Sequence, residues 1–385
     1  MPLVACDCIP DPDAAVLVDG ARAYARQELL PRDPAWDTEH GSVIDVLPTL
    51  AEMGFLNLCI PPELGGLGCA FSTYASIIHE LSYASPSVAV TVAVHSMVGR
   101  ILNEFAAEPL RTAVLSKWGE PADLAAFAIS EANAGSDPGA SRTEAAPVDG
   151  GLRITGEKMW ITNGLSARWF LTLVRLSGTN ARDGLCAVLI DGHDTGIERT
   201  PIRGKMGIRG SETAVIHYEN VFVPDDRIIG RDGDGLNVCL SALNQGRIGI
   251  AAQASGIAEA CVDEMVSYAR QREQFGQPIG RFQAVAEMIA DSATELAAAK
   301  ALTWRAARMV DARRRTAAAS SMAKLYASEA ANRIAYRAVQ VHGGAGYVHE
   351  CRVEQLYRDA RVTPIYEGTS EIQRLVIARE LAAAD

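Results

Sequence analysis

The segment Tyr357-Arg-Asp-Ala-Arg-Val-Thr-Pro-Ile-Tyr-Glu-Gly-Thr-Ser-Glu-Ile-Gln373 has one acid, Glu367, between Pro364 and Gly368. Proline disfavours helix in the residue before it, and glycine frees the backbone just after the acid. Glu367 is therefore expected on a short loop, where a carboxylate can reach a ligand without being locked into a surface ion pair. The same residues also allow an ordinary loop acid near the positive end of a helix dipole.

A helix is expected to begin directly after this loop, at about Thr369 or Ser370. Ser370 is followed three residues later by Gln373, which is the spacing of a capping box. The acid would then lie at a helix N-terminus.

The composition is that of a soluble globular protein. The chain has 385 residues, 48% hydrophobic and 22% charged, enough for two or three domains or one large body. A formal net charge of -11 argues against a nucleic-acid surface, but a few arginines can still bind an anionic ligand. No apolar run reaches the roughly 18 residues of a membrane span, and the N-terminus lacks the basic region of a signal peptide. We expect a cytoplasmic protein that binds neither nucleic acid nor membrane.

The 8 cysteines are scattered along the chain and include no Cys-x-x-Cys pair. Cys6 and Cys8 are close together but have no second pair to complete a zinc site, so we interpret them as part of a flexible N-terminus. Reduced, mostly buried thiols are expected, and no metal site.

The chain divides by pattern into three parts: 1–121, 122–232 and 233–385. The first part is expected to be helical, with a Gly/Pro-rich loop at 61–68 and helices over 14–30, 43–53, 73–83 and 88–105. The second contains β-branched and aromatic segments at 152–155, 169–174, 185–190 and 213–223, separated by turn residues. Without helices between them, these segments indicate a small antiparallel β-domain, barrel-like or a sandwich.

The third part returns to long alanine-rich amphipathic segments. Helices are expected over 244–271, 282–312, 315–341 and 370–381, which with short connections form a four-helix bundle. The predicted fold class is mainly α with a central β-domain. The basic run Arg313-Arg-Arg315 falls at a connection between helices and is interpreted as a solvated turn.

Five stretches in the same order resemble the acyl-CoA dehydrogenase family, most closely its short-chain, butyryl-CoA dehydrogenase-like members. The stretches are Phe127–Asp137, Lys158–Gly164, Arg272–Ile279, Gln340–Tyr347 and Ile365–Thr369. The resemblance extends over nearly the whole chain from about residue 12. The resemblance implies an N-terminal helical domain, an antiparallel β-barrel-like domain and a C-terminal four-helix bundle.

The resemblance also implies FAD as the cofactor. In the family, the residue at Trp160 packs on the isoalloxazine, and the hydroxyl at Thr162 bonds near the flavin N5. Alone, a Trp-x-Thr on a strand more often serves packing, with both side chains on one face. The further cofactor residues that the resemblance implies near the flavin are Phe127, Ile129, Ser130, Ser136, Thr369 and Glu371. The chain departs from the family pattern at Ser130, often Thr, and at Ala132, usually Pro, which leaves that turn less rigid.

A second set of cofactor residues is expected across a subunit boundary, at the pyrophosphate and adenine end of FAD. The set is Arg272, Phe275, Gln283, Gln340, Gly343 and Gly344. Arginine suits phosphate because its fork makes two charge-assisted bonds, although a helix-end arginine satisfying carbonyls is the default without the family. No Gly-x-Gly-x-x-Gly follows a strand, so a Rossmann site is not indicated.

For catalysis, the resemblance implies that Glu367 removes the α-proton of an acyl-CoA thioester while a hydride passes from the β-carbon to flavin N5, giving the trans-2-enoyl-CoA. Some relatives carry the base immediately before the residue at Arg247, expected to open the first bundle helix, but this chain has Gly246 there. Substrate contacts are expected from Ser136, Asn244, Arg247 and Gly368.

A short- to medium-chain substrate, an electron-transfer flavoprotein as acceptor and a homotetramer are expected with this reaction. Two alternatives stay open: an oxidase or desulfinase-like reaction on the same scaffold, and a non-catalytic flavoprotein subunit.

Overall fold

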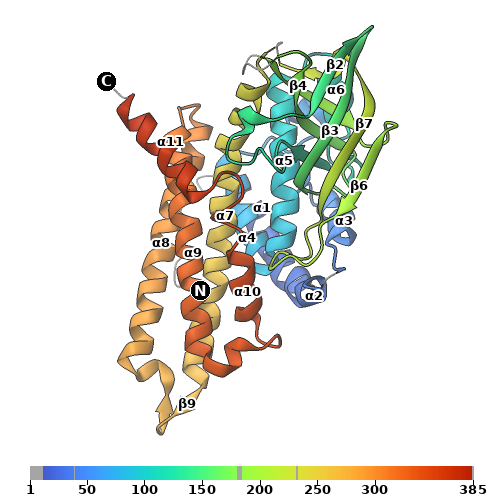
Figure 1. Ribbon diagram of the computed structural model, residues 1–385. Helices are drawn as coiled ribbons and strands as arrows, with labels where there is room; N and C mark the ends of the chain where they lie inside the picture. Colours follow the sequence, from blue (N-terminus) through green and yellow to red (C-terminus); the bar gives the residue numbers. More distant parts are fainter. Residues whose placement is uncertain (1–11, 39, 180–183, 231–232, 384–385) are drawn as a thin grey trace.

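The computed structural model describes residues 12–38, 40–179, 184–230 and 233–383. A long helical bundle, a sheet beside its upper half and an N-terminal group of helices form the molecule (Figure 1). The predicted class, mainly helical with a central β-domain, is confirmed. Cys6 and Cys8 lie outside the described residues.

The first helix is longer than expected. α1 (Pro12–Tyr24) continues through a π-helical turn, η1 (Ala25–Leu29), into α2 (Leu30–Trp36), so the predicted end before Pro31 is wrong. A proline in the first turn of a helical segment loses no hydrogen bond that the segment needs, and the wide π turn precedes it.

The rest of the N-terminal part follows the prediction closely. η2 (Ile44–Val46) and α3 (Leu47–Glu52) end before Gly54, whose φ of 73° is left-handed. η3 (Pro62–Leu64) lies in the Gly/Pro-rich loop. α4 (Phe71–Ala84), α5 (Pro86–Phe105), α6 (Leu110–Leu115) and η4 (Pro121–Asp123) complete it.

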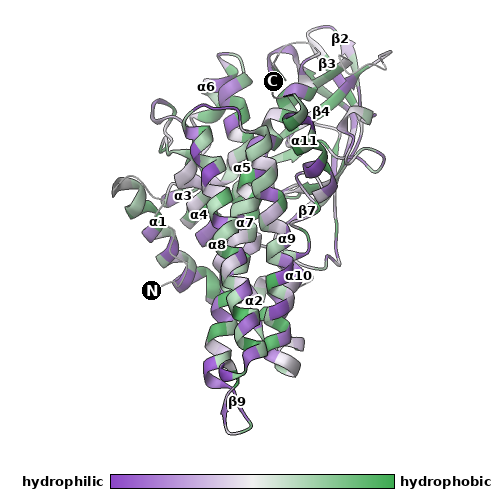
Figure 2. Ribbon diagram, turned by 90° about the vertical axis from the view of Figure 1, so that its left-hand side faces the viewer, coloured by the Kyte–Doolittle hydropathy of each residue, from purple (hydrophilic) through white to green (hydrophobic). Residues whose placement is uncertain are grey.

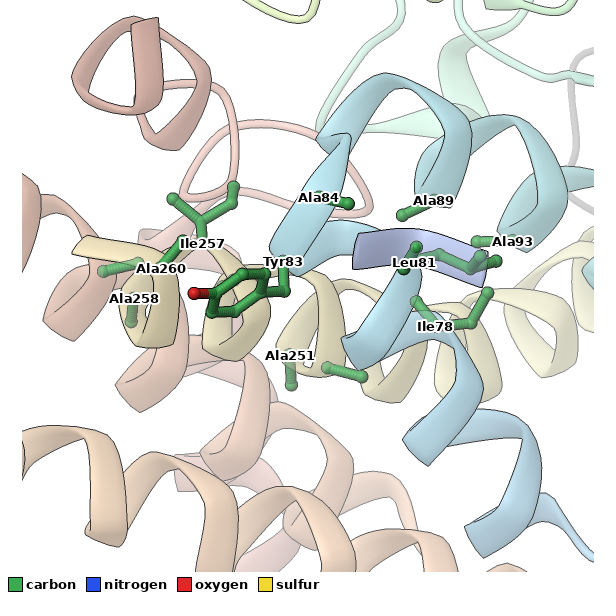
Figure 3. Packing of buried hydrophobic residues seen from close by; sticks show 14 of the residues in the cluster. Ile78, Leu81, Tyr83, Ala84, Ala89, Ala93, Ala251, Ile257, Ala258 and Ala260 are labelled. Carbon is green, nitrogen blue, oxygen red and sulfur yellow. The ribbon is translucent and has the colours of Figure 1, made fainter. Parts of the chain in front are cut away.

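The main core lies where α4 and α5 pack on the first bundle helix. Every residue of α4 is buried, as are most residues of α5, so both helices are enclosed on nearly all sides. Figure 3 shows Ile78 and Leu81 of α4 and Ala89 and Ala93 of α5 in this cluster with Ala251 of the bundle. Small residues let these helices approach closely, and α5 is white to green along much of its length in Figure 2.

The sheet has the strand order β6-β7-β3-β2-β4-β5-β8, with β1 also paired to β4. The strands are β1 (Ala125–Ala128), β2 (Glu144–Val148), β3 (Gly151–Thr162), β4 (Trp169–Leu176), β5 (Leu185–Asp191), β6 (Ile197–Pro201), β7 (Thr213–Pro224) and β8 (Ile228–Ile229), with η5 (Pro138–Ala140) and η7 (Asp225–Arg227) between them. Most pairs are antiparallel, as predicted, but β1 and β2 run parallel to β4. β2 pairs antiparallel with β3 along one edge and parallel with β4 along the other.

The bundle consists of α7 (Gly235–Gln271), α8 (Gln283–Asp311), α9 (Ala317–His342) and α11 (Ser370–Ala382). A small hairpin, β9 (Glu273–Gln274) and β10 (Gln277–Pro278), and η8 (Ile279–Arg281) join α7 to α8, and η9 (Gly343–Tyr347) follows α9. Residues 312–316 connect α8 to α9, as predicted for the basic run.

Two features of the bundle differ from expectation. α7 begins at Gly235 rather than near Asn244, so Arg247 lies well inside the helix and does not open it. A further helix, α10 (Arg352–Ala360), was not predicted. None of the helices in the described ranges is long and apolar enough to cross a membrane.

Candidate active site

Glu367 lies on the loop between α10 and α11 in an unusual backbone conformation. Its φ is 53°, and Gly368 follows with a φ of 90°. A non-glycine residue in the left-handed region is uncommon and persists where surrounding contacts hold it. The loop therefore presents its acid in one fixed orientation.

The helix after the loop begins at Ser370, as expected, but its cap is Thr369. The Thr369 Oγ1 accepts the Ile372 N–H at 3.4 Å. Ser370 instead donates its hydroxyl to Glu329 Oε1 of α9 at 2.6 Å, so the predicted capping box is not formed. Gln373 turns back and donates to the Gly368 carbonyl at 2.8 Å.

The Glu367 side chain lines a cavity and has few polar neighbours. Its Oε2 is buried and has no hydrogen-bond partner among the described residues. A Cβ on Gly246 would lie 2.7 Å from that oxygen and 2.8 Å from Met97 Sδ. Burial raises the pKa of Glu367 to about 7, against the lowering effect of the positive charges of Arg247 and Lys324.

The cavity has a volume of about 450 Å³ and lies between α5, α7, the sheet and the 365–372 segment. The predicted residues that line it are Phe127, Ile129, Ser130, Ser136, Trp160, Thr162, Arg247, Glu367, Gly368 and Thr369. Segments far apart in the sequence thus meet around one acid.

The part of the cavity wall that carries Trp160 has the properties of a platform for a flat cofactor. Trp160 is 61% exposed, which is unusual for so large an apolar side chain, and its φ is 65°. A register shift between Lys158 and Ile161 interrupts β3 here, so the expected strand alternation does not apply, although Trp160 and Thr162 both line the cavity. An open indole with the hydroxyls of Ser130, Ser136 and Thr162 nearby fits the flavin of FAD.

A buried ion pair supports this wall. Lys158 Nζ lies 2.8 Å from Glu131 Oε1 and also donates to the Ile129 carbonyl at 3.1 Å. Although burial opposes it, the Lys158 charge and the hydrogen bonds from Ser141 and Thr143 lower the pKa of Glu131 to about 2. The pair ties the strand that carries Trp160 to the turn that carries Ile129 and Ser130.

Two predicted residues lie beside the cavity without lining it. Asn244 accepts a hydrogen bond from Arg247 Nη1 at 2.8 Å and so orients the arginine. The side chain of Glu371 is 79% exposed and lies 4.0 Å from Arg374 Nη1. Neither side chain lines the cavity, so each would act on a ligand there only through a neighbouring residue.

The second predicted set gathers at the opposite end of the bundle. Arg272 and Phe275 lie where α7 meets the β9–β10 hairpin, at the lower end in Figure 1, and the imidazole of His342, next to Gly343, stacks on Tyr268 of α7. Arg247 and Arg272 are about 37 Å apart along α7 at 1.5 Å per residue.

This second surface is open. Phe275 is 93% exposed, and Cβ atoms built on Gly343 and Gly344 would meet nothing within 4 Å. Gln283 and Gln340 are exposed as well. No hydrogen bond or ion pair links the Arg272 side chain to another described residue, so its guanidinium can bind an anion.

Sequence reasoning missed several residues around Glu367. Lys324, a cation on a face of α9 otherwise made of small residues, is fully buried beside the loop; the neighbours on that face are Ser320, Ser321, Ala327, Ser328 and Ala331. A lone lysine in a helical stripe of alanine and serine is the signal that could have found it. The Tyr366 hydroxyl donates a hydrogen bond to Gln253 Oε1, and no local sequence motif indicates this pair.

Comparison with known families agrees with this architecture along the whole chain. Family models described as the N-terminal, middle and C-terminal domains of acyl-CoA dehydrogenase match residues 11–120, 126–221 and 233–382. The chain belongs to the acyl-CoA dehydrogenase family and is an oxidoreductase of that class.

Individual relatives are similar over nearly their full length. The chain is 37% identical to an acyl-CoA dehydrogenase of Bacillus subtilis, over 94% of this chain and 95% of that one. It is 38% identical to the human mitochondrial short-chain specific acyl-CoA dehydrogenase, over 95% and 89%. The structure of butyryl-CoA dehydrogenase from Megasphaera elsdenii superposes with a TM-score of 0.94 at 29% identity, covering 99% of this chain and 100% of that one.

Proposed function

We propose that the protein catalyses FAD-dependent α,β-dehydrogenation of an acyl-CoA thioester to the trans-2-enoyl-CoA, with Glu367 as the base. The observation that carries this proposal is the buried carboxylate of Glu367, whose Oε2 has no hydrogen-bond partner among the described residues and which lines the same cavity as the exposed Trp160. A carboxylate kept free of partners is available to accept a proton.

Glu367 would remove the α-proton of the thioester. A pKa of about 7 leaves a large fraction of the carboxylate ionised near neutral pH and makes it a stronger base than an ordinary glutamate. The Glu367 backbone N–H has no acceptor among the described residues, so it can donate to the thioester oxygen as negative charge develops there. The chemistry that FAD supplies is acceptance of the β-hydride at its N5 atom.

The lining of the cavity supports a short to medium acyl chain. Val90, Val94 and Ile250 line it and provide apolar contact for a few methylene groups. Tyr366 lines it as well, and its hydroxyl donates to Gln253 Oε1, while Gln253 Nε2 donates to the Pro86 carbonyl at 2.8 Å. Gln253 is fully buried, so these bonds hold the Tyr366 side chain in place against α7 and the start of α5.

The two cofactor clusters support an oligomer. A single FAD cannot contact both ends of the bundle, so Arg272, Phe275, Gln283, Gln340, Gly343 and Gly344 would hold the pyrophosphate and adenine of an FAD whose flavin lies in a neighbouring subunit. Shared sites of this kind are reciprocal in a two-fold dimer. A homotetramer built as a pair of such dimers is the proposed assembly, from the resemblance to the family.

An electron-transfer flavoprotein is the proposed electron acceptor. Direct reaction with oxygen would instead make the protein an oxidase, and oxygen consumption without an added acceptor separates the two. Rapid turnover with oxygen alone would replace this part of the proposal.

The test of the reaction is anaerobic titration of the purified yellow protein with straight-chain acyl-CoAs from C4 to C16. Bleaching of the bound flavin with butyryl- to octanoyl-CoA, and formation of the enoyl-CoA, is the expected result. No bleaching with any acyl-CoA would overturn the proposal, and a highest kcat/KM with palmitoyl-CoA would overturn the chain length alone.

A further inference from the structure

A buried lysine of α9 contacts the loop that carries Glu367. Lys324 of α9 has no exposed surface, and its Nζ donates to the Gly368 carbonyl at 2.7 Å. That carbonyl is its hydrogen-bond acceptor within the described part of the chain. Burying an ammonium is costly unless it is paired, so this position requires a compensating role.

The bond is made to a backbone that needs support. Glu367 and Gly368 both have left-handed φ angles, of 53° and 90°. The Gly368 carbonyl accepts from Lys324 of α9 and from Gln373 of α11, so two helices hold the peptide group between Gly368 and Thr369. Strained residues stay in place only when such contacts over-determine them.

We propose that Lys324 is the positioning residue of Glu367: it fixes the loop through the Gly368 carbonyl and contributes one of the two positive charges that keep the carboxylate ionised. The proposal rests on the proposed role of Glu367 as base. Lys324 itself does not touch the substrate in this account.

The charged groups around the pair come from every element packed on it. Arg247 of α7 is the second cation, and its Nη1 lies 3.3 Å from Ser321 Oγ, one turn before Lys324 on α9. Glu329 of α9 and Glu371 of α11 add negative charge near Lys324. Tyr74 and Tyr366 face Glu367 too, but burial raises the pKa of each far above its usual range, so both stay neutral.

The two groups define a pH window. Burial lowers the pKa of Lys324 to about 8, partly offset by the charge of Glu367. Burial raises the pKa of Glu367 to about 7. Between pH 7 and pH 8, Glu367 is therefore mainly ionised and Lys324 is mainly charged. Below the window the base gains a proton, and above it the bond to Gly368 loses its charge assistance.

The first test compares the pH dependence of anaerobic flavin reduction in the holoenzyme and its Lys324 variants. Lys324→Met should move the acid limb of the pH–rate profile to higher pH by about 1 pH unit or more, because one cation that stabilises the Glu367 carboxylate is lost. It should also lower the maximal rate of flavin reduction about 10- to 100-fold. Lys324→Arg keeps the charge at all pH values, so it should retain the acid limb and move the alkaline limb well above pH 8.

Lys300→Met is the matched control. Lys300 is also a buried lysine, bonded to Glu259 at 2.8 Å, and Glu259 lies about 18 Å from Arg247 along α7. Its loss should reduce thermal stability without moving either limb. If Lys324→Met does not fold, Lys324→Arg decides the matter: an alkaline limb that stays near pH 8 in that variant contradicts the proposal.

A second readout does not depend on turnover. Infrared titration of the carboxyl stretch, with Glu367→Gln identifying the band, should show Glu367 ionising near pH 7 in the wild type and at higher pH in Lys324→Met. An unshifted band overturns the role of Lys324 even if Glu367 proves not to be the base. Full activity of Glu367→Gln overturns the proposed base instead, so the two failures are distinguishable.

Discussion

Glu367 and Gly246 share one small space at the inner end of the cavity. A side chain on residue 246 would collide with the Glu367 carboxylate, since a Cβ there already comes within 2.7 Å of Oε2. Only one of the two positions can carry the base. The left-handed φ of 53° at residue 367 is also a conformation that glycine adopts without strain.

This geometry predicts the outcome of moving the base. Glu367→Gly alone should abolish flavin reduction by acyl-CoA, and adding Gly246→Glu should restore a measurable part of it, because both positions face the same volume. Stopped-flow absorbance of the flavin is the measurement. A double variant no faster than Glu367→Gly would show that the two positions do not address the same carbon.

The Gln253 side chain is expected to limit acyl length. Gln253→Ala removes the hydrogen-bond partner of Tyr366, which lines the cavity, so the Tyr366 side chain gains room to move and the preferred substrate should lengthen. The kcat/KM ratio of octanoyl-CoA to butyryl-CoA should increase about 10-fold or more, the scale of one or two methylene groups in an apolar pocket. Gln253→Glu, which keeps the volume, is the control and should not shift the ratio upward.

At the scale of elements, α10 joins three parts of the fold through buried acids. Asp359 accepts the backbone N–H of Ile208, from the loop before β7, and Gln355 donates to Asp33 of α2 at 2.7 Å. Burial raises the pKa of Asp359 to about 8, and that of Asp33 to about 6. The Asp359 carboxyl is therefore mainly protonated at neutral pH, whereas Asp33 is mainly ionised.

The sign of the resulting pH dependence follows from these shifts. Because the folded-state pKa of Asp359 is above the unfolded value, its contribution to stability is fully present at low pH and is lost as pH rises through about 8. Asp359→Asn keeps an acceptor for Ile208 and cannot ionise. Its thermal unfolding temperature should fall less than that of the wild type between pH 7 and pH 9. Equal losses in both proteins would contradict the assignment.

How far the sequence predicts these elements depends on the strength of the local pattern. The long apolar stripes of α4, α5 and α8 predicted helices with nearly correct ends. α10 was missed because only Val353, Leu356 and Ala360 among its buried residues are apolar, in a short, charged segment. The start of α7 was misplaced because Gly235 and Asn237 carry no helix signal, and the close packing of Gly235 on the Cys186 and Ala187 backbone of β5 is a tertiary contact.

The site was predictable where a residue belongs to a family motif and not where tertiary packing creates the contact. Glu367, Trp160 and Thr162 meet at one cavity, as the motifs led us to expect. The position of Lys324 depends on how α9 faces the loop, which no spacing in the sequence specifies. The left-handed backbone at Trp160 also follows from an interruption of β3 that alternation cannot predict.

At the scale of the whole molecule, the proposed FAD site is divided between the two ends of the bundle, one in each of two subunits. Arg272→Ala should weaken FAD retention, because a charge-assisted phosphate contact is lost, and should leave the fold intact because the side chain has no partner within the described chain. FAD absorbance after gel filtration and circular dichroism are the measurements. Arg153→Ala, at an exposed arginine of β3, is the control and should keep its FAD.

The same account predicts that FAD retention and assembly depend on each other. Sedimentation should show a tetramer or dimer for the yellow protein, with dissociation to monomers accompanied by loss of flavin. A monomer that holds FAD tightly would contradict the shared site.

The most direct measurement of the central claim is the rate of flavin reduction in Glu367→Gln with its best acyl-CoA. Glutamine keeps the volume and most hydrogen bonding but cannot accept the proton. FAD should stay bound, since other segments hold it, and CoA-ligand affinity should change little. The account predicts a fall of at least 10²–10⁴-fold, the loss typical of removing a general base, or about 3–5 kcal/mol of barrier. Reduction at near the wild-type rate would mean that another residue is the base.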